Sequence, residues 1–145
     1  MSKVKGLKAE SKTLHYLVSN EMTVLEPYGD NAPYDLAFEH NNDFIKVQCK
    51  TGIFDGDTVK SHIQRTNMTS NGTKQTHYNS EEVDVFAIYS YQREELYWIP
   101  FSEAPKTAIT IRITLPKNNQ SKGITLAKDC TLDNALEVIN SAWLG

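Results

Sequence analysis

The chain has 145 residues, a length that fits a single domain, residues 1–145, with one hydrophobic core. Hydrophobic residues make up 39% of the sequence and charged residues 23%, which excludes an intrinsically disordered chain. The formal net charge of −3 at pH 7 excludes a uniformly basic DNA-binding domain, so any surface for nucleic acid has to be local.

The first predicted element is a helix over residues 6–22. Residues spaced three and four apart define one of its faces, and these are Leu7, Glu10, Leu14, Leu17 and Val18. Glu10 is the one acid in this set. Because an ionised carboxylate facing a core is costly to desolvate, Glu10 pairs with a buried cation, lies at the edge of the face, or belongs to a site.

Three strands are predicted next, over residues 23–27, 34–39 and 44–51. The short polar link of residues 40–43 favours an antiparallel hairpin between the last two strands. Side chains alternate along each strand, so this hairpin has one apolar and one polar face.

The apolar face of the hairpin carries Leu36, Phe38, Ile45, Val47 and Cys49. The polar face carries Lys46, Gln48 and Lys50. Alternation in the first strand places Asp35 on this polar face, beside Gln48 and Lys50.

A polar insert over residues 52–80 follows the hairpin. From residue 58 to residue 80 it contains Lys60, Arg65 and Lys74 but no acid. Residues 58–69 alternate as a β-ribbon does, and Asn71-Gly72 suits a ribbon turn. The insert is therefore either a solvated polar loop or an extended β insert that reads DNA.

Strands are predicted over residues 83–91, 95–101 and 108–115, and the first is apolar enough to be central. The turn formers of residues 116–119 end the third strand. A last helix over residues 131–143 starts from Thr131 as N-cap. Its apolar stripe is Leu132, Ala135, Leu136, Ile139 and Trp143. This order of elements predicts a mixed α/β or α+β fold with a central sheet flanked by helices.

The polar face of the hairpin has two readings. Asp35 can be a turn acid, and Gln48 and Lys50 a solvated strand face. The same three residues also form a cluster, and the first helix, packed across this side of the sheet, would add Glu10 to it. The cluster suits metal-assisted hydrolysis of a phosphodiester.

Mg²⁺, or another divalent cation, prefers oxygen ligands. Glu10 and Asp35 offer carboxylates, Gln48 an amide oxygen, and Cys49 its backbone carbonyl. Lys50, a compact positive charge, can orient the attacking water or stabilise the transition state.

Pro33-Tyr34-Asp35, twelve intervening residues and Gln48-Cys49-Lys50, preceded by the helical Glu10, resemble the PD-(D/E)xK nuclease motif. Gln48 stands where that motif usually has an acid. With its length, polar insert and strand order, the whole chain is similar to homing endonucleases that cyanobacterial group I introns encode within tRNA genes. The resemblance implies a restriction-endonuclease-like core with catalytic Glu10, Asp35, Gln48 and Lys50. It also implies double-strand cleavage of a long DNA site by a homotetramer.

In this interpretation the insert contacts double-stranded DNA. Its side chains that can bind base edges or phosphates are Lys60, His62, Gln64, Arg65, Asn67, Thr69, Asn71, Thr73, Lys74, Gln75 and His77. Two alternatives stay open. A junction-resolving or repair nuclease would share the core, and a non-enzymatic DNA-binding module would follow if Gln48 marked a decayed active site.

No apolar run approaches the roughly 20 residues of a membrane span, and Lys3 and Lys5 are not followed by the apolar stretch of a signal peptide. We therefore expect a cytoplasmic protein without a membrane partner. Free thiols are expected at Cys49 and Cys130.

Overall fold

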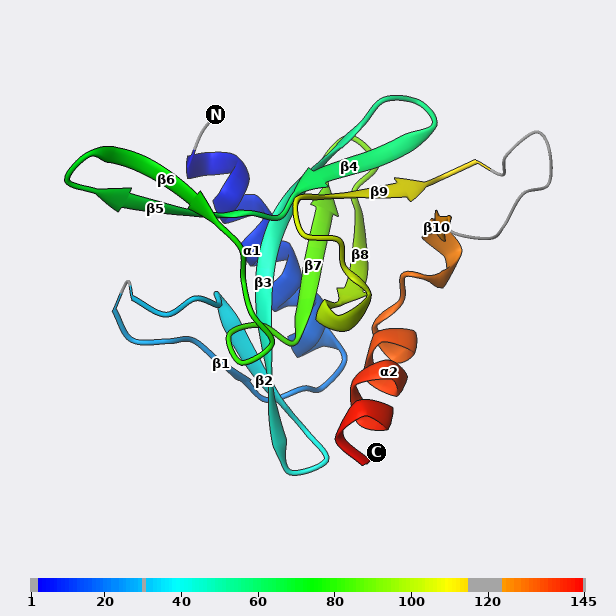
Figure 1. Ribbon diagram of the computed structural model, residues 1–145. Coiled ribbons are helices and arrows are strands. Elements are labelled where there is room, and N and C mark those ends of the chain that lie inside the picture. Colours follow the sequence, from blue (N-terminus) through cyan, green and yellow to red (C-terminus); the bar gives the residue numbers. More distant parts are fainter. Residues whose placement is uncertain (1–2, 30, 115–123, 145) are drawn as a thin grey trace.

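The computed structural model describes residues 3–29, 31–114 and 124–144. Helices stand at the two ends of the described chain, α1 (Lys3–Ser19) and α2 (Leu132–Leu144) (Figure 1). Ten strands lie between them: β1 (Val24–Leu25), β2 (Leu36–His40), β3 (Asp43–Phe54), β4 (Thr58–His62), β5 (Arg65–Thr69), β6 (Gly72–Thr76), β7 (Val85–Ser90), β8 (Glu95–Pro100), β9 (Ala108–Arg112) and β10 (Thr125–Leu126). Two 3₁₀ turns, η1 (Phe101–Glu103) and η2 (Ala127–Asp129), follow β8 and β10.

The long strand β3 organises the main sheet. It pairs antiparallel with β2 on one side and parallel with β7 on the other, and its last residues pair with β4. The sheet continues from β7 to β8, from β4 to β9 and β10, and from β2 to β1. The predicted central mixed sheet is confirmed, and β7 is central as expected, with all its residues buried.

Gly52 lies where β3 passes from β7 to β4. A Cβ atom at this position would lie 2.5 Å from the side chain of Val59 and 2.9 Å from that of Ile88. Only glycine lets these neighbouring strands approach so closely. The sheet can therefore change direction here and carry β4 and β9 away from the β7–β8 pair.

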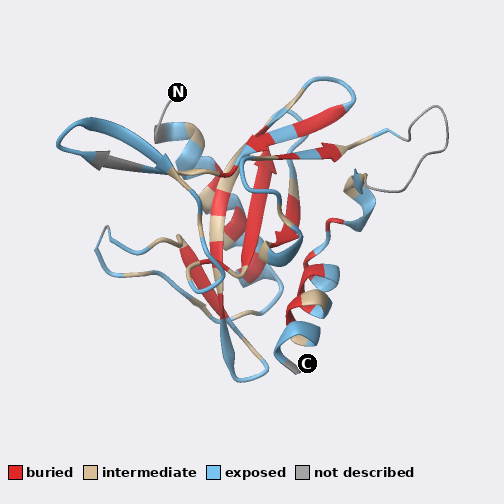
Figure 2. Ribbon diagram, viewed as in Figure 1, coloured by how far each residue is buried: buried red, intermediate tan, exposed pale blue. Residues whose placement is uncertain are grey.

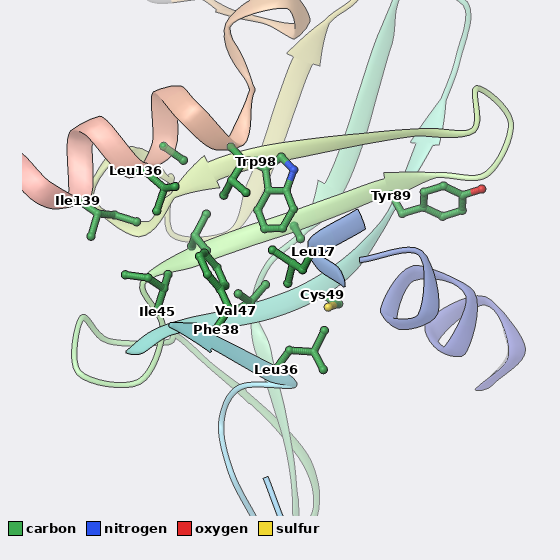
Figure 3. Close-up of a cluster of buried hydrophobic side chains, with 14 of the residues drawn as sticks. Leu17, Leu36, Phe38, Ile45, Val47, Cys49, Tyr89, Trp98, Leu136 and Ile139 are labelled. Atoms are coloured by element: carbon green, nitrogen blue, oxygen red, sulfur yellow. The ribbon is translucent and has the colours of Figure 1, made fainter. Parts of the chain in front are cut away.

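Both helices cover one face of the sheet. Val47 and Cys49 of β3 belong to the same buried cluster as Leu17 of α1 and Leu136 of α2. Figure 3 shows these side chains gathered around Trp98 between the two helices. Because neighbouring strand residues point to opposite faces, Gln48 and Lys50 face away from the helices. The prediction that the first helix packs across the side of Gln48 and Lys50 is therefore wrong.

A second buried cluster lies on the face opposite the helices. It is formed where β4 and β9 meet β7 and β8, and it includes Val59, Phe86, Ile88 and Ile111. Gln48 and Lys50 stand next to Phe86 and Ile88 in the register of β3 and β7. The polar face of β3 therefore borders this second cluster.

The buried face of α1 differs from the predicted one. Ala9, Thr13 and Leu17, each four residues apart, are buried, whereas Leu7 is 63% exposed and Val18 56% exposed. Thr13 can be buried because its hydroxyl donates to the Ala9 carbonyl at 2.7 Å. The predicted stripe mixed residues of two different faces of the helix.

In α2 the prediction holds except at its last residue. Thr131 caps the helix, since its Oγ1 accepts a hydrogen bond from the backbone N–H of Asn134 at 3.1 Å. The predicted stripe is buried as far as Ile139, but Trp143, one turn further on, is 47% exposed.

The predicted ribbon over residues 58–69 has different bounds in the structure. β4 is a strand of the main sheet, paired with β3 and β9, and Val59 and Ser61 on one of its faces are buried. The ribbon is instead the separate two-stranded sheet of β5 and β6, which projects from the rest of the molecule (Figures 1 and 2). Its two turn residues are Ser70 and Asn71, and Gly72, with φ of 111°, is the first residue of β6 and pairs with Thr69, so the predicted turn at Asn71-Gly72 lies one residue too far along the chain.

The turn predicted over residues 116–119 lies outside the described residues. Cys49 and Cys130 are buried free thiols, as expected. Within the ranges that the structure describes, neither helix combines the length and the hydropathy of a membrane span.

Candidate active site

Asp35 immediately precedes β2 and binds β3 through both its backbone and its side chain. Its backbone N–H donates to the Val47 carbonyl at 2.9 Å, and its carboxylate Oδ2 accepts a hydrogen bond from the Cys49 N–H at 2.9 Å. These two bonds flank Gln48. The structure therefore holds the Asp35 carboxylate beside Gln48, on the side of β3 that faces away from the helices.

Asp35 and Gln48 share a cavity of about 320 Å³. It lies between the loop before β2, strand β3 and the start of the β5–β6 ribbon. Its lining residues are Asn31, Ala32, Pro33, Asp35, Gln48, Arg65, Thr66 and Tyr78. A cavity of this size has room for a hydrated cation beside a phosphate group, since one liquid water occupies about 30 Å³.

Lys50 follows Gln48 on the same face of β3. Its Nζ lies 5.1 Å from the centre of the Tyr78 ring and donates to the Gln64 carbonyl at 3.4 Å. Burial lowers the pKa of Lys50, and the charge of Asp35 offsets part of that shift. Lys50 is thus a partly desolvated cation near the Asp35 carboxylate.

Asp35 itself is partly desolvated. Burial raises its pKa, against the opposing effects of the Cys49 hydrogen bond and the Lys50 charge. The carboxylate therefore becomes protonated at a higher pH than an exposed aspartate does. A bound cation would stabilise its ionised form.

Glu10 reaches this region from α1 on the other face of the sheet. Burial raises the pKa of Glu10, and the charges of Asp35 and Glu26 raise it further. Burial also raises the pKa of the Cys49 thiol to about 12, with further contributions from the charges of Asp35 and Glu10. Glu10 and Asp35 therefore influence the same groups electrostatically, although the helix packs against the opposite face.

This donor set fits a hard divalent cation. Two carboxylates with raised pKa values are accompanied by the Gln48 amide and the Cys49 carbonyl, all oxygen donors. Among the described residues no three His, Cys, Asp or Glu side chains converge on one point. A cation here would therefore take most of its ligands from neutral oxygens and water, as Mg²⁺ usually does.

Tyr78 is a residue of the cavity that the motif did not predict. Its ring contacts Phe86 edge-on at 5.7 Å between centroids and faces the Lys50 ammonium group. Burial raises the pKa of Tyr78 to about 12, with a further contribution from the charge of Asp35, so its hydroxyl stays protonated at neutral pH. An aromatic residue at the end of an otherwise polar insert is the sequence signal that marks it.

The residues predicted to bind DNA lie in several places. Lys60 and His62 are exposed on β4, and Thr73, Lys74 and Gln75 are exposed on β6. Thr69 and Asn71 form the ribbon turn, in which the Thr69 hydroxyl donates to the Gly72 carbonyl at 2.7 Å. The exposed members therefore extend along β4 and the ribbon rather than along one strand.

Other predicted DNA-binding residues are engaged within the protein. Gln64 is half-buried, and its carbonyl accepts from Lys50. His77 donates through Nδ1 to the Lys106 carbonyl at 3.0 Å. Arg65 forms an ion pair with Glu82. The Asn67 side chain lies outside what the structure describes.

Gln48 and Lys50 on the central strand of a mixed sheet, with the Asp35 carboxylate fixed beside them, are the arrangement that the PD-(D/E)xK nuclease motif predicts. A family model described as PD-(D/E)XK endonuclease matches residues 1–133. The chain belongs to the PD-(D/E)XK endonuclease family, as predicted, and nucleases of this family generally use divalent metals.

Among solved structures, the chain is similar to a bacterial homing endonuclease, I-Ssp6803I. The two align with a TM-score of 0.74 and 20% sequence identity over 98% of this chain and 96% of that one. This likeness confirms the predicted fold. No curated protein matches the sequence.

Proposed function

We propose that this protein is a metal-dependent, sequence-specific endonuclease that cuts both strands of DNA, with Glu10, Asp35, Gln48 and Lys50 as its catalytic residues. One observation carries the proposal: the Asp35 carboxylate is held against β3 beside Gln48, in a cavity next to Lys50. Because the chain belongs to a nuclease family, we assign phosphodiester hydrolysis to this arrangement.

The roles follow from the chemistry of each group. Glu10, Asp35, Gln48 and the Cys49 carbonyl would hold Mg²⁺ or another divalent cation, which would supply an acidified water and a counter-charge for the phosphate. Because Oδ2 of Asp35 accepts from the Cys49 N–H, the carboxylate is held in one orientation. Gln48 contributes an oxygen without charge, so the site carries one negative charge fewer than a site with an acid there.

Lys50 acts on the substrate rather than on the cation. A positive charge held beside the cavity can orient the attacking water or stabilise the charge that develops on the phosphate. Its contacts with the Tyr78 ring and the Gln64 carbonyl limit the directions that its ammonium group can take.

Sequence recognition is assigned to the β5–β6 ribbon and the neighbouring exposed residues of β4. A two-stranded ribbon fits the major groove, and Lys60, His62, Lys74 and Gln75 supply donors for phosphates and base edges. The similar solved structure is a homing endonuclease, which supports a long target site and homing of a mobile intron.

Double-strand cleavage requires more than one active site, and we propose a homotetramer acting in the cytoplasm. The outward side of α1 supports self-association, since Val4, Leu7 and Val18 are exposed on it. Leu7 and Val18 are eleven residues apart, which is close to three helical turns, so they share one face. Light scattering of the wild type and of Leu7→Glu tests this: a monomeric wild type contradicts the tetramer.

The function is tested by incubating the protein with randomised duplex DNA and Mg²⁺ and sequencing the ends. Ends with a shared flanking sequence are expected, and EDTA should abolish them. Preferential cutting of four-way junctions would support the resolving nuclease instead. Sequence-specific binding without cleavage in Mg²⁺, Mn²⁺ or Co²⁺ would support the non-enzymatic module.

A further inference from the structure

The cavity that holds Asp35 and Gln48 is poorly supplied with positive charge. Of the described residues that line it, Arg65 is the one cation, and Asp35 is the one anion. A phosphodiester that enters a protein of net charge −3 needs a cationic partner at the point of entry. Lys50 is a weaker candidate than Arg65, because it is not among the residues that line the cavity and its ammonium group contacts the Gln64 carbonyl and the Tyr78 ring.

Arg65 is placed for this role rather than for reading bases. It is the first residue of β5, at the base of the ribbon, and its side chain is only 31% exposed. The exposed ribbon residues Lys74 and Gln75 lie further along the partner strand, past Thr76, which pairs with Arg65. Because the Arg65 side chain lines the cavity, it would contact a phosphate bound there rather than the bases of a DNA groove that the ribbon enters.

Glu82 is the counter-ion of Arg65 in the free protein. The ion pair runs from Nη1 of Arg65 to Oε2 of Glu82, whose side chain is 20% exposed. Oε1 of Glu82 accepts from the backbone N–H of Asn79 at 3.0 Å, and the Asn79 side chain accepts in turn from the Glu82 N–H at 3.1 Å. Glu82 is therefore kept in place by its own turn, whether or not Arg65 is present.

The guanidinium has donors to spare. It carries five N–H groups in a planar fork, and the ion pair recorded among the described residues uses Nη1. The remaining N–H groups suit the two non-bridging oxygens of a phosphodiester, which a fork can bind bidentately. Arg65 can thus keep or release Glu82 when a phosphate arrives.

We propose that Arg65 binds the phosphate group being cleaved, in the cavity that it shares with Asp35 and Gln48, and that Glu82 neutralises it only in the free protein. This inference rests on the proposed endonuclease function. It makes Arg65 a catalytic residue whose contact is with phosphate, so it carries no sequence information.

The test compares Arg65→Ala, Arg65→Lys and Glu82→Gln with the wild type on the cleaved duplex. Arg65→Ala and Glu82→Gln both break the ion pair, so a purely structural role predicts the same loss of cleavage from each. We expect Arg65→Ala to slow single-turnover cleavage about 100-fold, the usual cost of removing a transition-state donor. Arg65→Lys should recover part of the rate, and Glu82→Gln should cut within about 3-fold of wild type.

Binding measurements complete the test. Arg65→Ala should weaken binding equally for all single-base variants of the target and make the salt dependence shallower by about one phosphate contact. Equal cleavage losses in Arg65→Ala and Glu82→Gln, or a change of base preference at one position in Arg65→Ala, would overturn the proposal. Asp35→Asn is the separate reference. If Asp35→Asn cuts like wild type, the assignment of the active site fails, and if the wild type cuts no duplex, the proposed function fails; in both cases the salt dependence of Arg65→Ala still reports phosphate binding.

Discussion

Asp35 and Asp84 bind the central strand β3 in the same way. Oδ2 of Asp35 accepts from the Cys49 N–H at 2.9 Å, and Oδ2 of Asp84 accepts from the Lys46 N–H at 2.8 Å. Each also donates its own N–H to a β3 carbonyl at 2.9 Å, and burial raises the pKa of both. They differ in surroundings, since Asp35 lines the cavity with Gln48, whereas the charged neighbour of Asp84 is Lys46. Asp84 is therefore a matched structural control for Asp35.

The first prediction concerns stability and cation binding. Because burial raises the pKa of Asp35 in the folded state, the folded protein holds this proton more tightly than the unfolded chain does. The free energy of unfolding therefore falls as pH rises from the unfolded-state pKa of Asp35 to its higher folded-state pKa. Ionised Asp35 is consequently destabilising at pH 7. We expect Asp35→Asn to raise the melting temperature in EDTA at pH 7 and to change it less at pH 4.

Bound cations should reverse the order of the melting temperatures of the wild type and Asp35→Asn. A ligand at 100 times its Kd adds about 2.7 kcal/mol to the free energy of unfolding. Mg²⁺ or Ca²⁺ should therefore raise the melting temperature of the wild type by several degrees and leave Asp35→Asn nearly unchanged. Equal cation-induced shifts in both proteins would remove Asp35 from the ligand set.

The second prediction concerns the pH dependence of cleavage. Burial and the charges of Asp35 and Glu26 raise the pKa of Glu10, so it loses its ligand charge at a higher pH than an exposed glutamate does. Cleavage should fall on acidification through a midpoint above 4.5, and more Mg²⁺ should move this midpoint to lower pH. A pH–rate profile at two Mg²⁺ concentrations checks this. A midpoint that does not move with Mg²⁺ would contradict a role for these carboxylates as ligands.

The third prediction concerns Tyr78. Its ring lies 5.1 Å from the Lys50 Nζ, and such cation–π contacts contribute about 0.5–2 kcal/mol. Tyr78→Leu should slow cleavage roughly 2- to 30-fold, whereas Tyr78→Phe keeps the ring and should lose less. Phe101→Leu is the control, because Phe101 also packs on Phe86, at 6.1 Å between centroids. An equal loss in Phe101→Leu would make the Tyr78 effect one of packing.

The fourth prediction concerns the β5–β6 ribbon. Because it is a separate two-stranded sheet, replacing residues 66–75 with a short Gly-Ser turn should leave the fold intact and abolish sequence preference. Lys74→Ala should weaken DNA binding. The slope of log K against log[salt] should become shallower by the amount that about one phosphate contact contributes. Lys12→Ala, on the exposed side of α1, is the matched control. Unchanged specificity after the replacement would mean that the ribbon is not the recognition element.

Local sequence patterns were sufficient to predict the fold around the site. The alternation along β3 placed Gln48 and Lys50 on one face, and the alternation in the preceding strand placed Asp35 on that same face, opposite Gln48. Both inferences depend on residues close in sequence. The same holds for the Thr131 cap, which satisfies the N–H of a residue three positions away.

Long-range packing could not be predicted in the same way. The periodicity of α1 combined Leu17, which is buried, with Leu7 and Val18, which are exposed, because small residues such as Ala9 and Thr13 give a weak signal. The face of the sheet that α1 covers depends on contacts between distant elements, so the approach of Glu10 was predicted from the wrong side. The contact of Tyr78 with Lys50 is likewise invisible in the sequence, since 27 residues separate them.

The most direct test of the account compares Asp35→Asn with Asp84→Asn in cleavage of target DNA with Mg²⁺. Both substitutions keep an oxygen that can accept the β3 amide hydrogen bond, so circular dichroism should show that both variants fold. We predict that Asp35→Asn cuts at least about 100-fold more slowly than wild type, because it loses a metal-binding carboxylate, while Asp84→Asn stays within about 3-fold. Cleavage by Asp35→Asn at the wild-type rate, or an equal loss in both variants, would contradict the assignment of the active site.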